Sequence, residues 1–540
     1  MTSVPGPLIL HTRLSAALRR LNAGQYRWGG AGVAVGLVLA SVLISLTART
    51  PSFPVGDHTD CGGPNRLTVA TGADITAGSF RRDLIEEWNH THTTQVVLVE
   101  VADPTDEQRA EMAGRSRLGS CAYDVLSVDV AWTTEFARSG YIRPYPLDPR
   151  QADLFLDNVL KTGQVDGVQY TVPFVTDVPL LFYRQGLPVP DTMERLWQYA
   201  AANGGYAVQL GDYEGGSVNL MEAIFSAGGR ITDGDRVILD EEVNGERVRE
   251  TLARWQTLLR NGTLAHGAED FSKQDTFDAF EEGLLARSPK DSAEESSLQA
   301  FRDEDTGYMR NWPFAFHRLA TDNSMYDDQR RLRFGLAALP GVGILGGFNL
   351  AISAYSDNPD KARMLIDFLT EHQAQARLFA CSGYPPVLKS VYEEYRRTPR
   401  TCKQLLEEQP SPSAETATGL SGREDCTTGT EANPATGAGS AAAGSPGEDP
   451  TITALMLQEL ADKIHQGVCK AESRPAYSYY SAFSEVFRGC ARAVVIGDLP
   501  AGDLDLPRFA DALRAARRGR APEGAAGSLA YCGKPERRPG

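Results

Sequence analysis

The chain has 540 residues, a formal net charge of −16 at pH 7 and 8 cysteines. This length exceeds what one hydrophobic core usually supports, so we expect two or three domains. The acidic balance, with no basic stripe interleaved with aromatic residues in the outer part of the chain, argues against a nucleic-acid partner.

The first fifty residues predict a membrane anchor. The stretch between Arg27 and Arg49 carries no charge and is long enough to cross about 30 Å of hydrocarbon. Arginines precede it and the first acidic residue of the chain is Asp57, an asymmetry that places the N-terminus in the cytoplasm and the bulk of the chain outside the cell. A cleaved signal peptide is the alternative interpretation. The predicted segments are a cytoplasmic basic tail at 1–26, one transmembrane helix at 27–49 and a linker at 50–63.

All 8 cysteines lie on the predicted outer side of the membrane, where an oxidising compartment favours disulfides. Position alone suggests three pairings: Cys61 with Cys532, Cys469 with Cys490, and Cys402 with Cys426. No CxxC pair or Cys/His cluster has the spacing of zinc ligands. We therefore expect no metal and no cofactor.

From residue 64 to residue 403, strand-like and helix-like patterns alternate. The runs at 66–72, 95–101 and 123–129 are typical of buried strands, and residues 77–89 carry the apolar periodicity of a helix. Alternation of this kind predicts an α/β fold with helices on both faces of a sheet. Such sheets bind ligands beyond the carboxyl ends of their strands.

The pattern breaks at residues 404–450, where Gly, Ala, Ser, Thr and Pro dominate. This composition buries too little apolar surface to offset the entropy of ordering, so we expect a disordered insertion. Helical periodicity returns in residues 451–518, and residues 519–540 form a tail.

The most informative segment is 165–184, VDGVQYTVPFVTDVPLLFYR. An alternating strand runs through Phe174 into Thr176 and Asp177, and Pro173 must lie at a strand end or edge because it cannot donate to a ladder. The segment presents an aromatic ring, a hydroxyl and a carboxylate where a sheet meets a loop. These groups suit a pocket for a small molecule rich in hydroxyls.

This segment resembles the crossing segment of extracellular solute-binding proteins of ABC importers, of the maltose/trehalose-binding type (family 1). Six further segments resemble that family in the same order, at 71–76, 123–132, 215–222, 301–316, 346–353 and 474–480. The resemblance implies a two-lobed periplasmic-binding-protein-like fold with a hinge, whose lobes exchange the chain near residues 175 and 340. The predicted membrane span and the insertion at 404–450 depart from the family pattern.

The resemblance also implies a sugar site, in which aromatic faces pack on the ring and polar groups bond to hydroxyls. The candidate hydrogen-bonding residues are Asp74, Asp129, Asp177, Asn219, Glu222 and Asn349. The candidate stacking residues are Trp132, Phe174, Trp312, Phe348 and Tyr384. A structural role is the alternative for seven of them: a turn or cap for Asp74 and Asp177, core or interface packing for Trp132, Phe174 and Trp312, a partly exposed helix position for Glu222, and a buried backbone partner for Asn349.

We therefore expect a membrane-anchored extracytoplasmic protein that captures a di- or oligosaccharide and delivers it to the permease subunits of an ABC importer. A ligand-binding sensor or surface scaffold not coupled to transport is the alternative. An enzyme is not expected, because no histidine lies near a GxSxG or cysteine-nucleophile motif, and no Walker loop is present. The identity of the ligand stays open at this point.

Overall fold

The computed structural model describes residues 61, 63–74, 76, 78–101, 105–265, 293–303, 305–407, 451–521 and 529–533. The chain divides into the compact units Met1–Thr59 and Asp60–Gly540, and the described residues all belong to the second. None of the described helices has the length and apolar character needed to cross a bilayer. The predicted transmembrane segment at 27–49 lies outside the described residues and stays a prediction.

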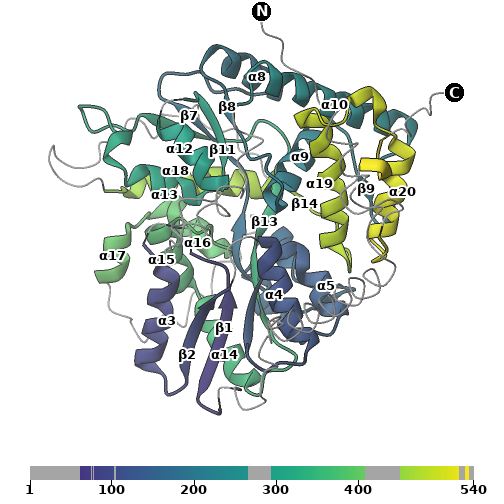
Figure 1. Cartoon of the computed structure of the whole chain (residues 1–540). Coiled ribbons are helices and arrows are strands. Elements are labelled where there is room, and N and C mark those ends of the chain that lie inside the picture. The colour runs from purple at the N-terminus through teal and green to yellow at the C-terminus, as the bar shows by residue number, and fades with distance from the viewer. Residues whose placement is uncertain are drawn as a thin grey trace, which may run out of the picture. The chain divides into compact units, whose positions relative to one another are not determined.

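The first sheet contains the three strands predicted near the N-terminus (Figure 1). Its strands are β1 (Arg66–Thr71), β2 (Gln95–Glu100), β3 (Val125–Asp129), β6 (Val172–Asp177), β13 (Ile344–Ile352) and β14 (Glu472–Ser473). The order is β14-β13-β3-β1-β2, and β6 also pairs with β13. Since β1 runs parallel to β2 and β3, their carboxyl ends meet at one edge.

The second sheet has the order β12-β7-β11-β8. Its strands are β7 (Leu180–Arg184), β8 (Tyr206–Ala207), β11 (Tyr308–Asn311) and β12 (Phe334–Ala338). Two short antiparallel pairs complete the strands: β4 (Gln164–Val165) with β5 (Val168–Gln169), and β9 (Thr232–Asp233) with β10 (Arg236–Val237).

Helices cover the sheets. The first part of the chain contributes α3 (Phe80–Thr91), α4 (Thr105–Arg117), η4 (Val130–Trp132), α5 (Thr133–Arg138), α6 (Pro149–Asp153) and α7 (Asp157–Lys161). The middle contributes α8 (Met193–Ala202), α9 (Glu214–Ser226), α10 (Glu242–Arg260), α12 (Ala293–Arg302), α13 (Phe314–Ala320) and η6 (Asn323–Met325). Beyond β13 come α14 (Pro359–Leu369), α15 (His372–Ser382), α16 (Lys389–Arg397), α17 (Cys402–Glu407), α18 (Ala454–Lys470), α19 (Tyr480–Ile496), η8 (Ala501–Asp503), α20 (Leu506–Ala516) and η9 (Leu529–Tyr531).

The ends of two predicted segments differ from expectation. Residues 404–407 belong to α17, so the first residues of the predicted insertion are helical, while 408–450 lie outside the described residues. The predicted C-terminal tail contains η9, which is followed by the buried Cys532. A disulfide from Cys532 to Cys490 of α19 holds this short element on the domain.

The chain passes between the two sheets through adjacent connections. Strand β6 leads into β7 through Val178 and Pro179, and β12 leads back into β13 through residues 339–343. Both pairs are antiparallel, so β6–β13 in the first sheet is continued by β7–β12 in the second. The two lobes are therefore joined by two neighbouring crossings, at residues 178–179 and 339–343. We call β6 and β13, which lead into and out of them, the crossing strands.

The alternation of side chains along β7 divides the core in two. Leu180 and Phe182 belong to one apolar cluster and Leu181 to the other, because successive residues of a strand point to opposite faces. Each cluster also contains residues of the first sheet, for example Val69 in one and Leu126 in the other. The hydrophobic core therefore continues from one lobe into the next.

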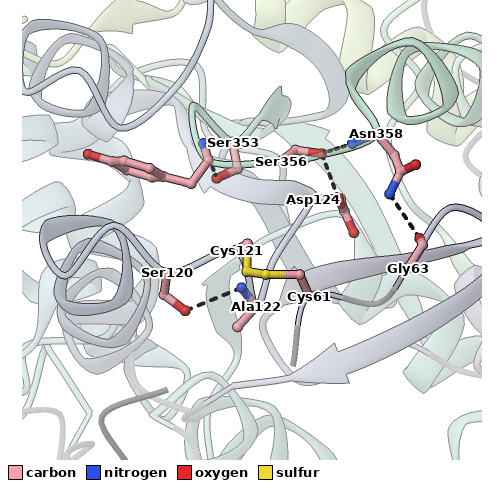
Figure 2. The surroundings of a disulfide bond; sticks show 10 residues. Cys61, Gly63, Ser120, Cys121, Ala122, Asp124, Ser353, Ser356 and Asn358 are labelled. Carbon is pink, nitrogen blue, oxygen red and sulfur yellow. Dashed lines mark hydrogen bonds between the residues drawn. A yellow bond between two sulfur atoms is a disulfide. The ribbon is translucent and has the colours of Figure 1, made fainter. Parts of the chain in front are cut away.

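The three disulfide pairings suggested by position are wrong. The described bonds are Cys61–Cys121, Cys381–Cys402 and Cys490–Cys532. Figure 2 shows the first, which joins the segments that lead into the neighbouring strands β1 and β3. Its surroundings are held by Asp124, which accepts hydrogen bonds from Thr68 N at 2.9 Å and from Ser356 Oγ at 2.5 Å. The pairing of Cys61 with Cys121 thus follows from the fact that β1 and β3 are neighbours in the sheet, which their separation along the sequence does not reveal.

Gly347 is required by the crossing itself. Its φ of +116° favours glycine, and an added Cβ would collide with the carbonyl oxygen of Val175 on β6. Gly347→Ala should lower the free energy of unfolding by roughly 2–4 kcal/mol, measured by urea denaturation. The control is Gly114→Ala in α4, where an added Cβ meets nothing within 4 Å and should stabilise the helix by about 0.5–1 kcal/mol. Equal effects at the two positions would contradict this account of the crossing.

Candidate functional site

A buried ion pair supports the indole of Trp312. Arg310 is fully buried in β11 and forms a two-point contact with Glu222 of α9, with Nε–Oε2 at 3.1 Å and a second nitrogen to Oε1 at 2.8 Å. The guanidinium carbon lies 3.7 Å from the centroid of the Trp312 ring, a cation–π contact. Glu222 also accepts a hydrogen bond from Ile344 N at 3.2 Å. One ion pair therefore fixes α9, β11, the start of β13 and the ring of Trp312.

Burial and charge act against each other within this pair. Burial raises the pKa of the Glu222 carboxyl, and the Arg310 guanidinium opposes that rise. Burial lowers the pKa of Arg310, but the neighbouring carboxylate raises it by more, so the guanidinium keeps its charge. Removing either Arg310 or Glu222 alone would destabilise the fold, because the remaining charge would be left unpaired in an apolar surrounding.

Trp312 lies beside the crossing strands. Gly346 of β13 is paired with Asp177 of β6, and a Cβ added at Gly346 would lie 3.3 Å from the Cβ of Asp177 and 3.8 Å from Cζ3 of Trp312. The missing side chain of Gly346 thus leaves room between the Trp312 ring and the side chain of Asp177. Phe348, two residues further along β13, is half-buried and packs against the apolar cluster that contains Phe174. Two predicted site residues, Trp312 and Asp177, are therefore brought together beside Gly346.

A second group of polar residues lies at the carboxyl end of β1. Asp74 Oδ1 accepts hydrogen bonds from Tyr384 OH at 2.9 Å, Thr76 Oγ1 at 2.6 Å and Thr76 N at 3.1 Å. Burial raises the pKa of Tyr384, so its phenol stays protonated and donates to Asp74. Two further predicted residues, Asp74 and Tyr384, are thus in direct contact.

This second group adjoins the crossing. Thr176 N, in β6, donates to the carbonyl of Pro385 at 3.2 Å, next to Tyr384 in the chain. Three buried oxygens here have no hydrogen-bond partner among the described residues: Asp74 Oδ2, Thr176 Oγ1 and Ser382 Oγ. Buried polar atoms usually have a partner, so these oxygens are available to hydroxyl groups of a ligand or to water. Sequence reasoning missed Ser382, because serine in a helix carries no local signal of a ligand site.

The other predicted residues have their partners inside the protein. Asn219 donates to Gln209 Oε1 at 3.3 Å and to Gly215 O at 2.9 Å. Asn349 is fully buried and donates to the hydroxyls of Thr162 and Thr171 at 3.1 and 3.0 Å. Trp132 and Phe174 belong to the two apolar clusters. As ligand contacts these residues, with Asp129 described next, stay predictions.

Asp129 belongs to a buried charge network that sequence reasoning missed. Arg474 donates to Asp129 Oδ1 at 2.5 Å and to Glu214 Oε1 at 2.9 Å. Asp129 ends β3 in the first sheet, whereas Glu214 opens α9, which packs with the second lobe. Tyr480 OH and Ser484 Oγ of α19 also donate to Glu214, each at 2.6 Å. Arg474 therefore links the two lobes, across a separation of 345 residues from Asp129 that no local pattern reveals.

One group of possible metal ligands occurs among the described residues: Cys61, Cys121 and Asp357. The two cysteines form a disulfide with each other, so they offer no thiolate to a cation. We assign no metal to this group.

A family model described as bacterial extracellular solute-binding protein matches residues 83–401. The chain belongs to this family. A relative from Deinococcus radiodurans, described as a probable ABC transporter-binding protein, is 25% identical over 334 residues, which are 57% of this chain and 73% of the relative.

Two solved structures of this architecture show the same fold. Maltose-bound MalE3 of T. maritima is 20% identical with a TM-score of 0.61, and the match covers 83% of this chain and 99% of MalE3. The GacH receptor of Streptomyces glaucescens, solved unliganded and with acarbose, is 18% identical with a TM-score of 0.59, covering 84% of this chain and 99% of GacH. The predicted two-lobed periplasmic-binding-protein-like fold is thus confirmed, as is the resemblance to solute-binding proteins of ABC importers.

The ion pair beneath Trp312 can be tested by a double-mutant cycle. Arg310→Met leaves the Glu222 carboxylate buried and unpaired, so it should lower the free energy of unfolding by about 3–5 kcal/mol. Arg310→Met combined with Glu222→Leu should recover most of that loss, as measured by urea denaturation. Arg254→Met is the control, because Arg254 also packs on a tryptophan, Trp197 at 5.3 Å, but its side chain is 56% exposed. If the loss of unfolding free energy in the double mutant equalled the sum of the losses in Arg310→Met and Glu222→Leu, the coupling between the two residues would be contradicted.

His317 gives the stability of the fold a pH dependence. Its Nε2 donates to Ala380 O at 3.1 Å, and burial lowers its pKa to about 4. The folded protein therefore keeps His317 neutral down to about pH 4, while the unfolded chain takes up the proton near pH 6.5. The free energy of unfolding should fall by about 3 kcal/mol from this residue as the pH drops from 6.5 to 4.

We expect His317→Gln to flatten the pH dependence of stability over that window, relative to wild type, in urea denaturation series. His90→Gln, at an exposed position of α3, is the control and should leave the slope as it is in wild type. An unchanged slope in His317→Gln would show that other groups carry the acid sensitivity.

Proposed function

We propose that this chain is a membrane-anchored extracytoplasmic solute-binding protein. In this proposal it holds a di- or oligosaccharide between its two lobes and delivers the sugar to the membrane subunits of an ABC importer. The observation that carries the proposal is that the ring of Trp312 and the side chain of Asp177 both lie beside Gly346 of β13. An aromatic ring packs on the C–H face of a sugar, and a carboxylate accepts hydrogen bonds from its hydroxyls.

Polar side chains after β1, on β6 and at the end of α15 supply further hydrogen-bonding groups for a sugar. Asp74, Thr176 and Ser382 each present a buried oxygen without a partner among the described residues. Hydroxyls can act as donors and acceptors at once, so a ligand with several hydroxyls satisfies such a set better than an apolar ligand does. Hydrogen bonds to a charged carboxylate are worth about 1.5–3 kcal/mol each.

The relatives support the choice of ligand and partner. The similar solved structures were determined with maltose and with acarbose bound, and the Deinococcus relative is described as a probable ABC transporter-binding protein. The stretch between Arg27 and Arg49, which carries no charge, supports an anchor with the domain outside the cell. The site at the crossing would close by rotation of the lobes about their connections.

The first test is thermal melting of residues 50–540 against a panel of sugars, polyols, peptides and amino acids. A ligand present at about 100 times its dissociation constant should stabilise the fold by about 2.7 kcal/mol, enough for a clear increase in Tm. An increase with di- or oligosaccharides is the expected result. A response confined to peptides or amino acids would contradict the carbohydrate assignment, and no response at all would favour the scaffold alternative.

Trp312→Ala should weaken binding of the responding sugar at least tenfold, about 1.4 kcal/mol, because the stacking surface is lost. The measurement is titration calorimetry of wild type and variant. Trp197→Ala is the matched control: Trp197 also lies over an arginine, but it belongs to α8 and is not among the predicted site residues. Unchanged affinity in Trp312→Ala, with a normal Tm, would remove Trp312 from the site.

A further inference from the structure

A serine, a histidine and a glutamate are aligned by hydrogen bonds on α15 and α16. His372 is the first residue of α15, and its Nδ1 lies 2.8 Å from Ser390 Oγ on α16. Its Nε2 lies 2.7 Å from Glu394 Oε2 on the same helix. Ser390 and Glu394 are four residues apart, so both side chains project from one face of α16. The imidazole of His372 bridges them.

The hydrogen bonds set the tautomer of His372. An ionised carboxylate only accepts hydrogen bonds, so Nε2 carries the proton and donates to Glu394. Nδ1 is then the acceptor for the hydroxyl proton of Ser390. The imidazole is thereby oriented as a general base toward the serine, as in nucleophile–base–carboxylate triads, with the two ring nitrogens exchanged.

Glu394 is itself held in place. Its second oxygen, Oε1, accepts a hydrogen bond from Arg400 Nε at 2.7 Å, and its side chain is only 10% exposed. Burial raises the pKa of Glu394, while the hydrogen bonds from His372 and Arg400 lower it by more, so the net shift is downward and the group stays ionised. His372, by contrast, keeps 41% of its side chain exposed, and Ser390 is half-buried. The serine end of the group can therefore be reached from solvent.

A hydrogen-bond donor lies next to the serine hydroxyl. Ser390 is the second residue of α16, a helix of nine residues, where backbone N–H groups lack acceptors within the helix. The neighbouring amides are occupied: Lys389 N donates to Leu154 O at 3.0 Å and Val391 N to Leu388 O at 3.3 Å. The positive end of the helix dipole also favours negative charge at this place. The Ser390 N–H is thus placed to stabilise an oxyanion formed beside its own side chain.

We propose that Ser390, His372 and Glu394 hydrolyse carboxylic esters, with Ser390 as nucleophile, His372 as general base and acid, and Glu394 as the residue that positions the imidazole. No GxSxG motif accompanies them, since the surrounding sequence is VLKSVYEEY, so the constellation exists only in three dimensions. It shares no residue with the crossing site. The proposal therefore stands or falls independently of sugar binding.

The chemistry proceeds in two balanced steps. The Oγ of Ser390 forms a bond to the carbonyl carbon of the ester while its proton moves to His372 Nδ1, and the oxyanion accepts from Ser390 N–H. The C–O bond to the alcohol then breaks, and the alcohol leaves with the proton from Nδ1. Water attacks the acyl-serine, gives its proton to Nδ1, and releases the carboxylic acid as the proton returns to Ser390.

The experiment uses the full chain and two probes, p-nitrophenyl acetate and a fluorophosphonate. The expected results are hydrolysis above the buffer rate and covalent labelling of Ser390, located by peptide mass spectrometry. Ser390→Ala and His372→Gln should each lower kcat at least about 100-fold. Glu394→Gln should lower kcat while KM changes less than about twofold, which a merely structural role of Glu394 would not produce.

Ser324→Ala is the matched control, because Ser324 is exposed and its hydroxyl bonds to Asp322 rather than to a histidine. This variant should keep full activity and labelling. Melting curves of all variants, with Ser390→Thr as a variant that keeps the hydroxyl and thereby the fold, separate loss of chemistry from loss of structure. Absence of labelling at Ser390 in folded wild type, or hydrolysis that survives in Ser390→Ala, would overturn the proposal.

Discussion

The pairing of β6 with β13 is the constraint on which the arrangement of this protein depends. At Gly347 the two backbones approach so closely that a side chain would collide with Val175. This pairing is continued in the second sheet by β7 and β12, so the lobes are joined where the chain crosses between them. Asp177 ends one crossing strand and Trp312 lies over Gly346 of the other. The candidate ligand site therefore lies where β6 and β13 approach each other most closely.

Two buried arginines secure this arrangement. Arg310 pairs with Glu222 beneath Trp312, and Arg474 pairs with both Asp129 and Glu214. A buried guanidinium is costly unless its charge is matched, so each arginine is compatible with few arrangements of its neighbours. We infer that these pairs select one relative placement of the connected elements rather than adding large net stability.

Local pattern was sufficient for much of the fold. The apolar runs at 66–72, 95–101 and 123–129 correspond to β1, β2 and β3, because a buried strand must be apolar whatever its neighbours are. The resemblance to solute-binding proteins led to Trp312 and Asp177, which the structure places side by side. It also led to Glu222, whose carboxylate pairs with the Arg310 guanidinium that lies against the ring of Trp312.

What sequence could not provide were long-range partners. The Cys61–Cys121 disulfide and the contact of Arg474 with Asp129 join segments whose proximity is decided by strand order. The alignment of His372 with Ser390 depends on how α15 packs beside α16 (Figure 1). The most direct test of the central claim is hydrogen exchange by mass spectrometry, with and without the sugar that raises Tm most. Capture at the crossing predicts slower exchange in peptides covering 172–177 and 344–350 together with the segment that follows β1. Slower exchange confined to other parts of the chain, with these peptides unchanged, would contradict the account.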